Sequence, residues 1–334
     1  MDKNCQDKSI TNKAQIGVIG GGYWGKNLIR VFYQLGVLKF ICDSNEELMA
    51  NYRNNYPDVF FTTQPEELIK KNDIDAIVIA TPASTHYSIA KISLEHNKHV
   101  FCEKPLALTV KEGEDLSRIA EEKNLILMVG HILHYHPAIK KLKQIIRNKE
   151  LGDIEYMYSN RTNIGRIRHE ENILWSFAPH DISLILSLAG CLPARVIAHG
   201  GIFLPHDVED VTLTFLSFPN NVKAHIFVSW LNPFKEQKFV VIGTKKMAVF
   251  DDTERDNKLV LYQHKISWKE NDIPLIEKAE AEIVETEKTE PLKEEAEHFI
   301  HCIETKEKPL TDAQEALNVL KVLEMAEHSL KESR

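Results

Sequence analysis

The sequence predicts an α/β protein with an N-terminal, doubly wound parallel sheet and a second domain built on an antiparallel sheet. Before about Gly152, short apolar runs alternate with amphipathic helical segments, as in right-handed strand–helix–strand crossovers. Beyond it, apolar and polar residues alternate with a period of two in Val211–Phe215 and Val222–Trp230, as in antiparallel strands with one exposed face. A chain of 334 residues is long enough for two domains.

The first half begins with a strand at Gln15–Ile19, a glycine-rich turn and a helix that runs to about Gln34. Helical patterns follow at Ile89–Glu95 and Val110–Lys123. Further strands, most of them almost wholly apolar as in sheets covered on both faces, are expected at Leu38–Cys42, Val59–Thr62, Ala76–Ala80, His99–Cys102 and Leu125–Val129.

The second half is expected to contain a helix from Pro179 to Ala189 that ends at Gly190. The charge-rich segment Asn271–Glu290 is expected to be a surface loop. Short strands are expected at Phe239–Ile242, Met247–Phe250 and Leu259–Tyr262, and closing helices at Glu294–Glu304 and Ala313–Leu330. We therefore divide the chain into a flexible leader (1–14), a first domain (15–132) and a second domain (133–334).

Composition excludes several classes of function. A net charge of −8 is unlike the basic footprint of a nucleic-acid-binding protein. No apolar run approaches the roughly 20 residues that span a bilayer, and the polar leader has no signal-peptide core. The five cysteines are widely spaced and form no CxxC pair, which argues against a disulfide framework or a zinc site. We expect a cytoplasmic protein without nucleic-acid or membrane partners.

The glycine-rich turn reads Gly20-x-Gly22-x-x-Gly25 and joins the first strand to the first helix. Glycines there permit a tight turn, close approach of a pyrophosphate and close helix–strand packing, and the helix N-terminus favours the phosphate charge. Asp43 ends the second strand, where its carboxylate would accept hydrogen bonds from ribose hydroxyls and repel a 2′-phosphate. These residues predict NAD(H) as cofactor; the alternatives are a plain glycine turn and an ordinary turn aspartate.

Thr81-Pro82-x-x-Thr85-His86 follows the fourth strand, at the sheet edge where a cofactor crevice is expected. The proline would end the strand and shape the wall of that crevice. The alternative is a threonine that caps a helix beside an exposed histidine.

Glu103-Lys104-Pro105 follows the fifth strand. Pro105 disfavours a helical backbone at Lys104, which would aim its ammonium group into the crevice. There it could stabilise negative charge that develops on a substrate oxygen. The alternative is a surface Glu-Lys turn.

Two polar clusters follow. Arg161, Arg166 and Arg168 form a positive cluster that suits carboxylate or pyrophosphate groups, the alternative being a solvated basic loop. His131-x-x-His134-x-His136 has no acidic or cysteine partner at ligand spacing, so no metal is expected, and His131 is expected to line the cofactor or substrate pocket.

Taken together, these motifs resemble the Gfo/Idh/MocA family of sugar and inositol dehydrogenases over essentially the whole chain after the leader. The resemblance rests on the glycine turn, Ala80-Thr81-Pro82, Glu103-Lys104-Pro105, Gly130-His131 and Glu290-Pro291-Leu292. It implies a Rossmann domain followed by an α/β domain with a large, mostly antiparallel open sheet that commonly forms subunit contacts, hence a homodimer or homotetramer. It also implies that Lys104 is the active-site lysine and that no metal is used.

The family's second signature carries an aspartate and a histidine four residues apart on one helix, whereas here His180 and Asp181 are adjacent and reversed. By resemblance His180 supplies the catalytic imidazole, and the role of Asp181 stays open. This variant, with the arginines, is similar to the UDP-N-acetylglucosaminuronate 3-dehydrogenase subgroup, which serves surface polysaccharide synthesis. The implied reaction oxidises the C3 hydroxyl of the uronate, with NADH reoxidised in place by 2-oxoglutarate. The alternatives are UDP-N-acetylglucosamine, an inositol or a free sugar as substrate, or a non-catalytic NAD-binding sensor.

The expected site has two groups of residues besides the catalytic pair, Lys104 and His180. Residues expected to contact the cofactor are Gly20, Gly22, Tyr23, Trp24, Gly25, Asp43, Ser44, Thr81, Pro82, Thr85, His86, Glu103, Lys104 and His131. Residues expected to contact the substrate are Lys104, Arg161, Asn163, Arg166, Arg168, Asn172, Trp175 and His180.

Overall fold

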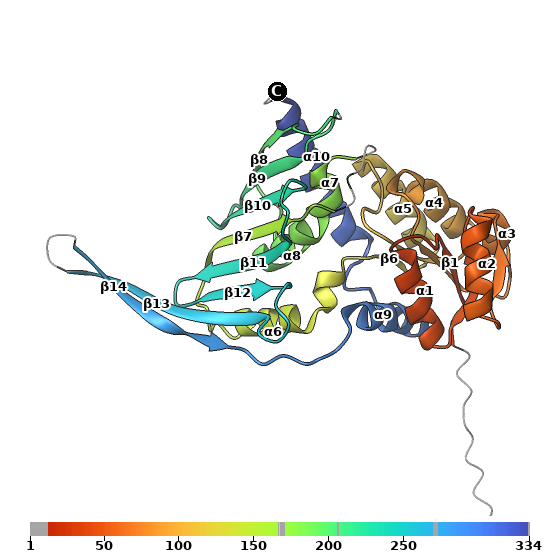
Figure 1. Cartoon of the computed structure of the whole chain (residues 1–334), viewed down its shortest axis with the longest axis horizontal. Helices are drawn as coiled ribbons and strands as arrows, with labels where there is room; N and C mark the ends of the chain where they lie inside the picture. Colours follow the sequence, from red (N-terminus) through yellow and green to blue (C-terminus); the bar gives the residue numbers. More distant parts are fainter. Residues whose placement is uncertain (1–12, 166, 168–170, 206, 270–272, 333–334) are drawn as a thin grey trace, which may run out of the picture.

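A computed structural model of the protein describes residues 13–165, 167, 171–205, 207–269 and 273–332. Two sheets stand side by side with helices between and around them (Figure 1). The first is parallel throughout, with the strand order β3-β2-β1-β4-β5-β6. Its strands are β1 (Ile16–Ile19), β2 (Leu38–Cys42), β3 (Phe60–Thr62), β4 (Ala76–Ile79), β5 (His99–Cys102) and β6 (Leu127–Val129).

This strand order is that of a Rossmann fold, and the order reverses between β1 and β4, where such sheets bind dinucleotides. The predicted doubly wound sheet is therefore confirmed. The helices of this half are α1 (Gly25–Gln34), α2 (Glu46–Asn55), α3 (Pro65–Ile69), α4 (His86–Glu95) and α5 (Val110–Glu122).

Helix α9 (Pro291–Thr305), although near the end of the chain, packs against this first half. Its Phe299 ring meets the ring of Phe101 at 5.6 Å, and Phe101 in turn contacts Phe32 of α1. The chain thus returns to the cofactor half after building the second sheet. The domain boundaries at residues 14 and 132 stay predictions.

The second sheet is mixed and mostly antiparallel, with the order β14-β13-β12-β11-β7-β10-β9-β8 and one parallel pair, β7 with β10. This confirms the predicted large antiparallel sheet. Its strands are β7 (Ile154–Thr162), β8 (Arg195–Gly201), β9 (Val211–Ser217), β10 (Lys223–Ser229), β11 (Glu236–Gly243), β12 (Met247–Asp251), β13 (Leu259–Lys269) and β14 (Ile273–Ile283).

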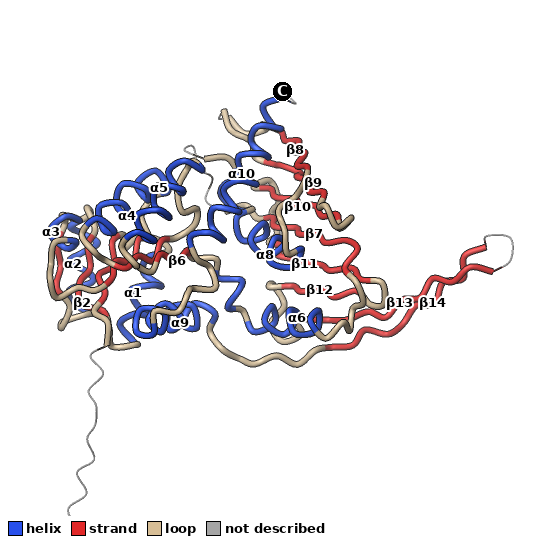
Figure 2. Tube along the Cα trace, turned by 180° about the vertical axis from the view of Figure 1, so that it is seen from behind, coloured by secondary structure: helices blue, strands red, loops and turns tan. Residues whose placement is uncertain are grey.

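One face of this sheet carries helices, and these lie between it and the first sheet (Figure 2). They are α6 (Pro137–Arg147), α7 (Ile173–Phe177), α8 (Pro179–Ala189) and α10 (Ala313–Glu332). As predicted, α8 begins at Pro179 and ends at Gly190, which takes a left-handed conformation (φ +73°). No described helix covers the other face of the sheet.

The expected surface loop at Asn271–Glu290 is wrong over most of its length. Residues Ile273–Ile283 form β14, which pairs with β13 in a hairpin that projects beyond the rest of the sheet (Figure 1). A projecting two-stranded ribbon has no core to bury, so Glu277, Glu280 and Glu282 lie exposed along it. Small and apolar residues do alternate with charged ones at Ala279, Ala281 and Ile283, but the high charge of the segment favours a loop over a strand.

Candidate active site

The glycine turn after β1 packs against itself and leaves one side open. Gly20 has a φ of +97°, and a Cβ at Gly25 would lie 1.9 Å from the carbonyl oxygen of Gly20. By contrast, a Cβ at Gly22 would meet no atom within 4 Å. The open space at Gly22, at the start of α1, is where the pyrophosphate of a dinucleotide would approach the main chain. The residues present therefore fit the predicted cofactor.

Asp43 fastens this turn to the end of β2. Its Oδ2 accepts a hydrogen bond from the N–H of Gly21 at 2.7 Å, and its Oδ1 accepts one from the N–H of Asn45 at 2.8 Å. Tyr52 donates its hydroxyl to the carbonyl of Gly21 at 2.6 Å. Ser44 follows directly and is exposed. The carboxylate charge beside the turn would disfavour a 2′-phosphate.

Trp24 bridges the glycine turn and the loop after β5. Its indole Nε1 donates to Oε1 of Glu103 at 2.5 Å, whereas the neighbouring Tyr23 ring is 78% exposed. Gly130 makes room for this carboxyl group, since a Cβ there would lie 3.0 Å from Glu103 Oε1. Burial raises the pKa of Glu103 to about 7, despite the Trp24 bond and the nearby Lys104. Glu103 is thus a partly buried carboxyl group whose pKa lies near neutral pH.

His86 joins the loops that follow β4 and β5. Its Nδ1 lies 2.7 Å from the carbonyl oxygen of Pro105, and its Nε2 lies 2.9 Å from that of Thr81. The side chain is 1% exposed, so the alternative of an exposed histidine is wrong. The Thr85 hydroxyl donates to Pro82 O at 2.8 Å. His86 therefore links the two loops. Direct contacts of Thr81, Pro82, Thr85 and His86 with a cofactor stay predictions.

Lys104 reaches from the first sheet to the helices of the second. It follows β5, its peptide bond to Pro105 is cis, and its Nζ donates to the carbonyl oxygen of Ser176 on α7 at 2.6 Å. This contact places the ammonium group at the junction of the two halves. The alternative of a surface Glu-Lys turn is therefore wrong.

His180, in the first turn of α8, is a half-buried imidazole with a buried Nδ1, beside that ammonium group. Among the described residues, its Nδ1 has no hydrogen-bond partner. Burial lowers its pKa well below the ordinary value, and the positive charges of Lys104 and Arg161 lower it further. The ring is therefore neutral and can accept a proton or a hydrogen bond. A buried nitrogen without a partner is uncommon and is a frequent mark of a functional site.

Asp181, whose role the sequence left open, pairs with Arg161 of β7. Arg161 Nε lies 2.8 Å from Asp181 Oδ2 and its Nη2 lies 3.1 Å from Oδ1, while Ser159 donates to Oδ1 at 2.7 Å. The carboxylate is 1% exposed. Asp181 thus balances the arginine charge next to His180, and direct contact of Arg161 with a substrate stays a prediction.

The other residues expected at the substrate are placed differently. Asn172 caps α7 and donates its side-chain amide to Glu209 at 3.2 Å and to Glu327 of α10 at 2.9 Å. The Trp175 indole also donates to Glu327, at 3.2 Å. These contacts tie α7 to α10. Asn163 is half-buried just after β7. Arg166 and Arg168 lie outside the described residues.

His131, which the sequence predicts to line the cofactor or substrate pocket, contacts a glutamate that the sequence did not single out. His131 Nδ1 is 2.7 Å from Glu315 of α10, and the His131 ring meets the His180 ring with centroids 6.2 Å apart. Glu315 comes 184 positions after His131, so no local spacing could have joined them. No cluster of potential metal ligands occurs in the described parts of the chain.

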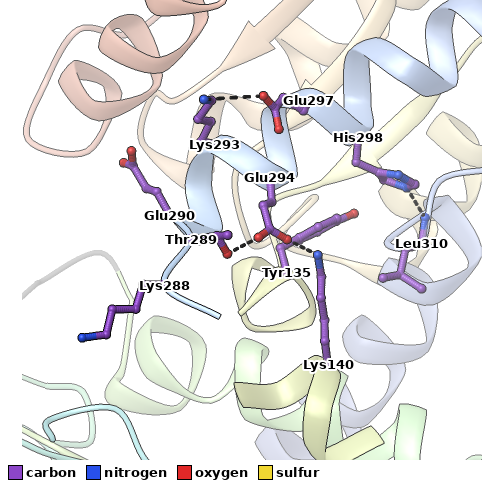
Figure 3. Close-up of a pocket in the computed structure, with 10 residues that line it drawn as sticks. All are labelled: Tyr135, Lys140, Lys288, Thr289, Glu290, Lys293, Glu294, Glu297, His298 and Leu310. Carbon is purple, nitrogen blue, oxygen red and sulfur yellow. Dashed lines mark hydrogen bonds and ion pairs between the residues drawn. The ribbon is translucent and has the colours of Figure 1, made fainter. Parts of the chain in front are cut away.

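A cavity of about 740 Å³ lies elsewhere, between α6 and α9 (Figure 3). Its charged side chains largely satisfy one another, for example Lys140 with Glu294 and Lys293 with Glu297. None of its lining residues is among those expected to bind cofactor or substrate. It is therefore distinct from the site around Lys104.

Comparison with known proteins agrees with this fold. Residues 14–131 match the model of the oxidoreductase family with an NAD-binding Rossmann fold, and residues 139–249 match the GFO/IDH/MocA C-terminal domain. The chain belongs to the Gfo/Idh/MocA family of NAD-dependent oxidoreductases. No helix in the described ranges has the length and apolar character needed to cross a bilayer.

Three relatives illustrate the range of this similarity. UDP-N-acetylglucosamine 3-dehydrogenase from Acidithiobacillus ferrooxidans is 26% identical over 86% of this chain and 88% of its own. Its structure superposes with a TM-score of 0.83 at 23% identity, over 96% of this chain and 98% of its own. The NAD-dependent scyllo-inositol 2-dehydrogenase of Bacillus subtilis is 26% identical over 78% of this chain and 76% of its own. Levoglucosan dehydrogenase, in complex with NADH and levoglucosan, superposes with a TM-score of 0.84 at 20% identity, over 96% of this chain and 98% of its own.

Proposed function

We propose that this protein oxidises the C3 hydroxyl of UDP-N-acetylglucosaminuronate, a UDP-linked N-acetylated uronic acid, to the 3-keto sugar. The observation that carries the proposal is that Lys104 and His180 lie near each other at the junction of the two halves. Lys104 follows β5 of the cofactor sheet and donates to Ser176, four positions before the neutral, half-buried His180. A cation and a neutral base beside a Rossmann crevice suit the oxidation of an alcohol.

The two side chains have complementary tasks. A neutral His180 accepts the proton of the hydroxyl group, and the Lys104 ammonium stabilises the negative charge that develops on the oxygen. NAD, when bound, supplies the acceptor for the hydride from C3. The glycine turn and Asp43 would hold the cofactor, while Trp24 and Glu103 would close its side of the crevice.

The arginines support an anionic substrate. Arg161 is occupied by Asp181, so recognition of the uronate carboxylate and the pyrophosphate falls on Arg166 and Arg168. Both lie in the segment between β7 and α7, and α7 carries the carbonyl that Lys104 contacts. Arginine binds such groups through paired hydrogen bonds.

UDP-N-acetylglucosamine is the second candidate, because a relative with that activity matches 86% of this chain. The same Lys104 and His180 chemistry would apply. The arginines discriminate, since Arg166→Ala and Arg168→Ala should weaken binding of a uronate through its carboxylate and change a neutral sugar only through the shared pyrophosphate.

Three further parts of the proposal rest on the family resemblance. These are reoxidation of bound NADH by 2-oxoglutarate, a cytoplasmic role in surface polysaccharide synthesis, and assembly as a homodimer or homotetramer through the second sheet. The face of that sheet that no described helix covers supports the last of these.

The test is a single-turnover measurement of NADH formation with purified protein, NAD and UDP-N-acetylglucosaminuronate, with UDP-N-acetylglucosamine as the control substrate. Each reaction is run with and without 2-oxoglutarate. Reduction with the uronate alone supports the proposal, and reduction with the neutral sugar nucleotide alone replaces it with the second candidate. If neither substrate reduces NAD while NAD still binds, inositols, free sugars and a sensor role become the alternatives.

A further inference from the structure

A partly buried chain of hydrogen bonds runs behind the proposed substrate site. Lys143 Nζ lies 2.8 Å from His134 Nδ1, and His134 Nε2 lies 2.7 Å from the hydroxyl of Ser183. The Ser183 hydroxyl contacts Glu315 Oε1 at 2.5 Å, and Glu315 Oε2 lies 2.7 Å from His131 Nδ1. The five side chains come from α6, η2 (Ile132–Tyr135) and the residue before it, α8 and α10.

Lys143 at one end of the chain is a donor and Glu315 near the other end is an acceptor, and together they fix the direction of each hydrogen bond. A Lys143 ammonium can only donate, so His134 accepts at Nδ1 and carries its proton on Nε2. That proton goes to Ser183 Oγ, which leaves the serine hydroxyl to donate to Glu315. A carboxylate only accepts, so His131 carries its proton on Nδ1 and its lone pair on Nε2.

The charges around this chain are consistent with those protonation states. Burial alone would raise the pKa of Glu315, but His131, His134 and the Ser183 bond outweigh it and the pKa is lowered. Burial, followed by the charge of Lys143, lowers the pKa of His134 to about 3. Burial also lowers the pKa of Lys143 to about 8, with Arg147 adding to this and Glu315 opposing it. Glu315 is thus an ionised carboxylate, and His134 is neutral at pH 7.

The two histidines at the site therefore have opposite surroundings. A positive charge on His180 is opposed by burial and by Lys104 and Arg161. A positive charge on His131 would have the Glu315 carboxylate at 2.7 Å. His131 also lies near the Glu103 carboxyl group. Of the two rings, His131 is the one with a carboxylate on its Nδ1, whereas His180 has cations around it.

We propose that His131 and Glu315 form a carboxylate–imidazole dyad that holds the proton released when the substrate hydroxyl is oxidised. The O–H bond breaks, its electron pair forms the C=O π bond, and the C3 hydride leaves to the nicotinamide. The proton passes from the hydroxyl to His180 and on to His131, whose ring centroid is 6.2 Å away. Glu315, Ser183, His134 and Lys143 are positioning residues that keep the acceptor lone pair of His131 on Nε2.

The dyad itself can be tested without any substrate, although its role rests on the proposed oxidation. Spectra of the full-length protein labelled with ring ¹⁵N histidine report the tautomer and the titration midpoint of His131, whose signal is identified by its loss in His131→Gln. We expect the Nδ1–H tautomer, and a midpoint that falls by at least one pH unit in Glu315→Gln. An Nε2–H tautomer or an unmoved midpoint would overturn the dyad.

The role of the dyad is tested by kinetics on whichever sugar nucleotide the wild type oxidises. We expect Glu315→Gln to lower kcat about 10²-fold at pH 7 and to leave KM for NAD unchanged. The acid limb of the pH profile of kcat should move to lower pH. The matched control is Glu324→Gln, on the same helix, whose carboxylate accepts from the N–H of Val110 at 2.6 Å and should leave kcat and the limb unchanged. Equal loss at every pH, with the limb unmoved, would mean a structural role and would overturn the proposal. If the wild type oxidises no sugar nucleotide, the proposed function fails while the spectra still decide the dyad.

Discussion

The cofactor side and the substrate side of this protein are built by different means. At the glycine turn, main-chain groups make the site, and each residue lies within a short stretch or at the end of a neighbouring strand. On the substrate side, buried charges from distant segments hold one another, as Arg161 does with Asp181 and Glu315 with His131. The first side tolerates little change of shape, and the second tolerates little change of charge.

The largest effect is expected where the two sides meet. Lys104→Ala removes the ammonium group that we place against the developing alkoxide, so kcat should fall by about 10²–10⁴-fold. Because Lys104 does not form the glycine turn, NADH binding followed by fluorescence should remain close to wild type. His180→Ala is expected to behave in the same way. Turnover near the wild-type rate in either variant would remove that residue from the proposed mechanism.

The buried pair Arg161–Asp181 tests the role of charge on the substrate side. Asp181→Ala leaves the guanidinium buried without its partner, and we expect a loss of about 3–5 kcal/mol in the free energy of unfolding, measured in urea. The control is Asp115→Ala, which breaks surface contacts with Lys91 of α4 and Arg118 of α5 and should cost less than about 1 kcal/mol. Equal losses in the two variants would contradict the contrast between the two sides.

The same contrast decides what could be predicted from the sequence. Gly20, Asp43 and Lys104 were predicted at their structural positions because each belongs to a local motif at a strand end. Asn172 was expected at the substrate, but its amide is bound by Glu209 and Glu327. Such a contact depends on how α10 packs, and a single sequence carries no local signal for it.

Missed elements have physical reasons of the same kind. Strand β14 lies in a projecting ribbon and is rich in charged residues, a composition that favours a loop. Ser183 and Glu315 look like ordinary helix residues until α8 and α10 come together around His131. The sequence thus predicts strand-end motifs well and helix–helix partners poorly.

Glu103 offers a pH test on the cofactor side. Its pKa is raised from 4.5 to about 7 in the folded protein. A raised pKa means that the stabilising contribution of Glu103 is complete below pH 4.5 and is lost as the pH rises through 7. Between pH 5 and pH 8, wild type should lose up to about 3 kcal/mol of unfolding free energy relative to Glu103→Gln. Urea titrations of both proteins at the two pH values measure this difference. If the unfolding free energies of the two proteins change with pH in the same way, Glu103 does not cause the pH dependence.

The smallest expected effects come from two glycines three positions apart, and they separate shape from binding on the cofactor side. A Cβ at Gly25 would strike the Gly20 carbonyl at 1.9 Å, so Gly25→Ala should cost about 1–3 kcal/mol in stability. A Cβ at Gly22 meets nothing within 4 Å, so Gly22→Ala should stay within about 0.5 kcal/mol of wild type. That methyl group would nevertheless stand where the pyrophosphate must approach, and NADH affinity should fall about tenfold, or about 1.4 kcal/mol. If Gly22→Ala binds NADH as wild type does, the cofactor phosphates lie elsewhere, and the open side of the turn is not their cradle.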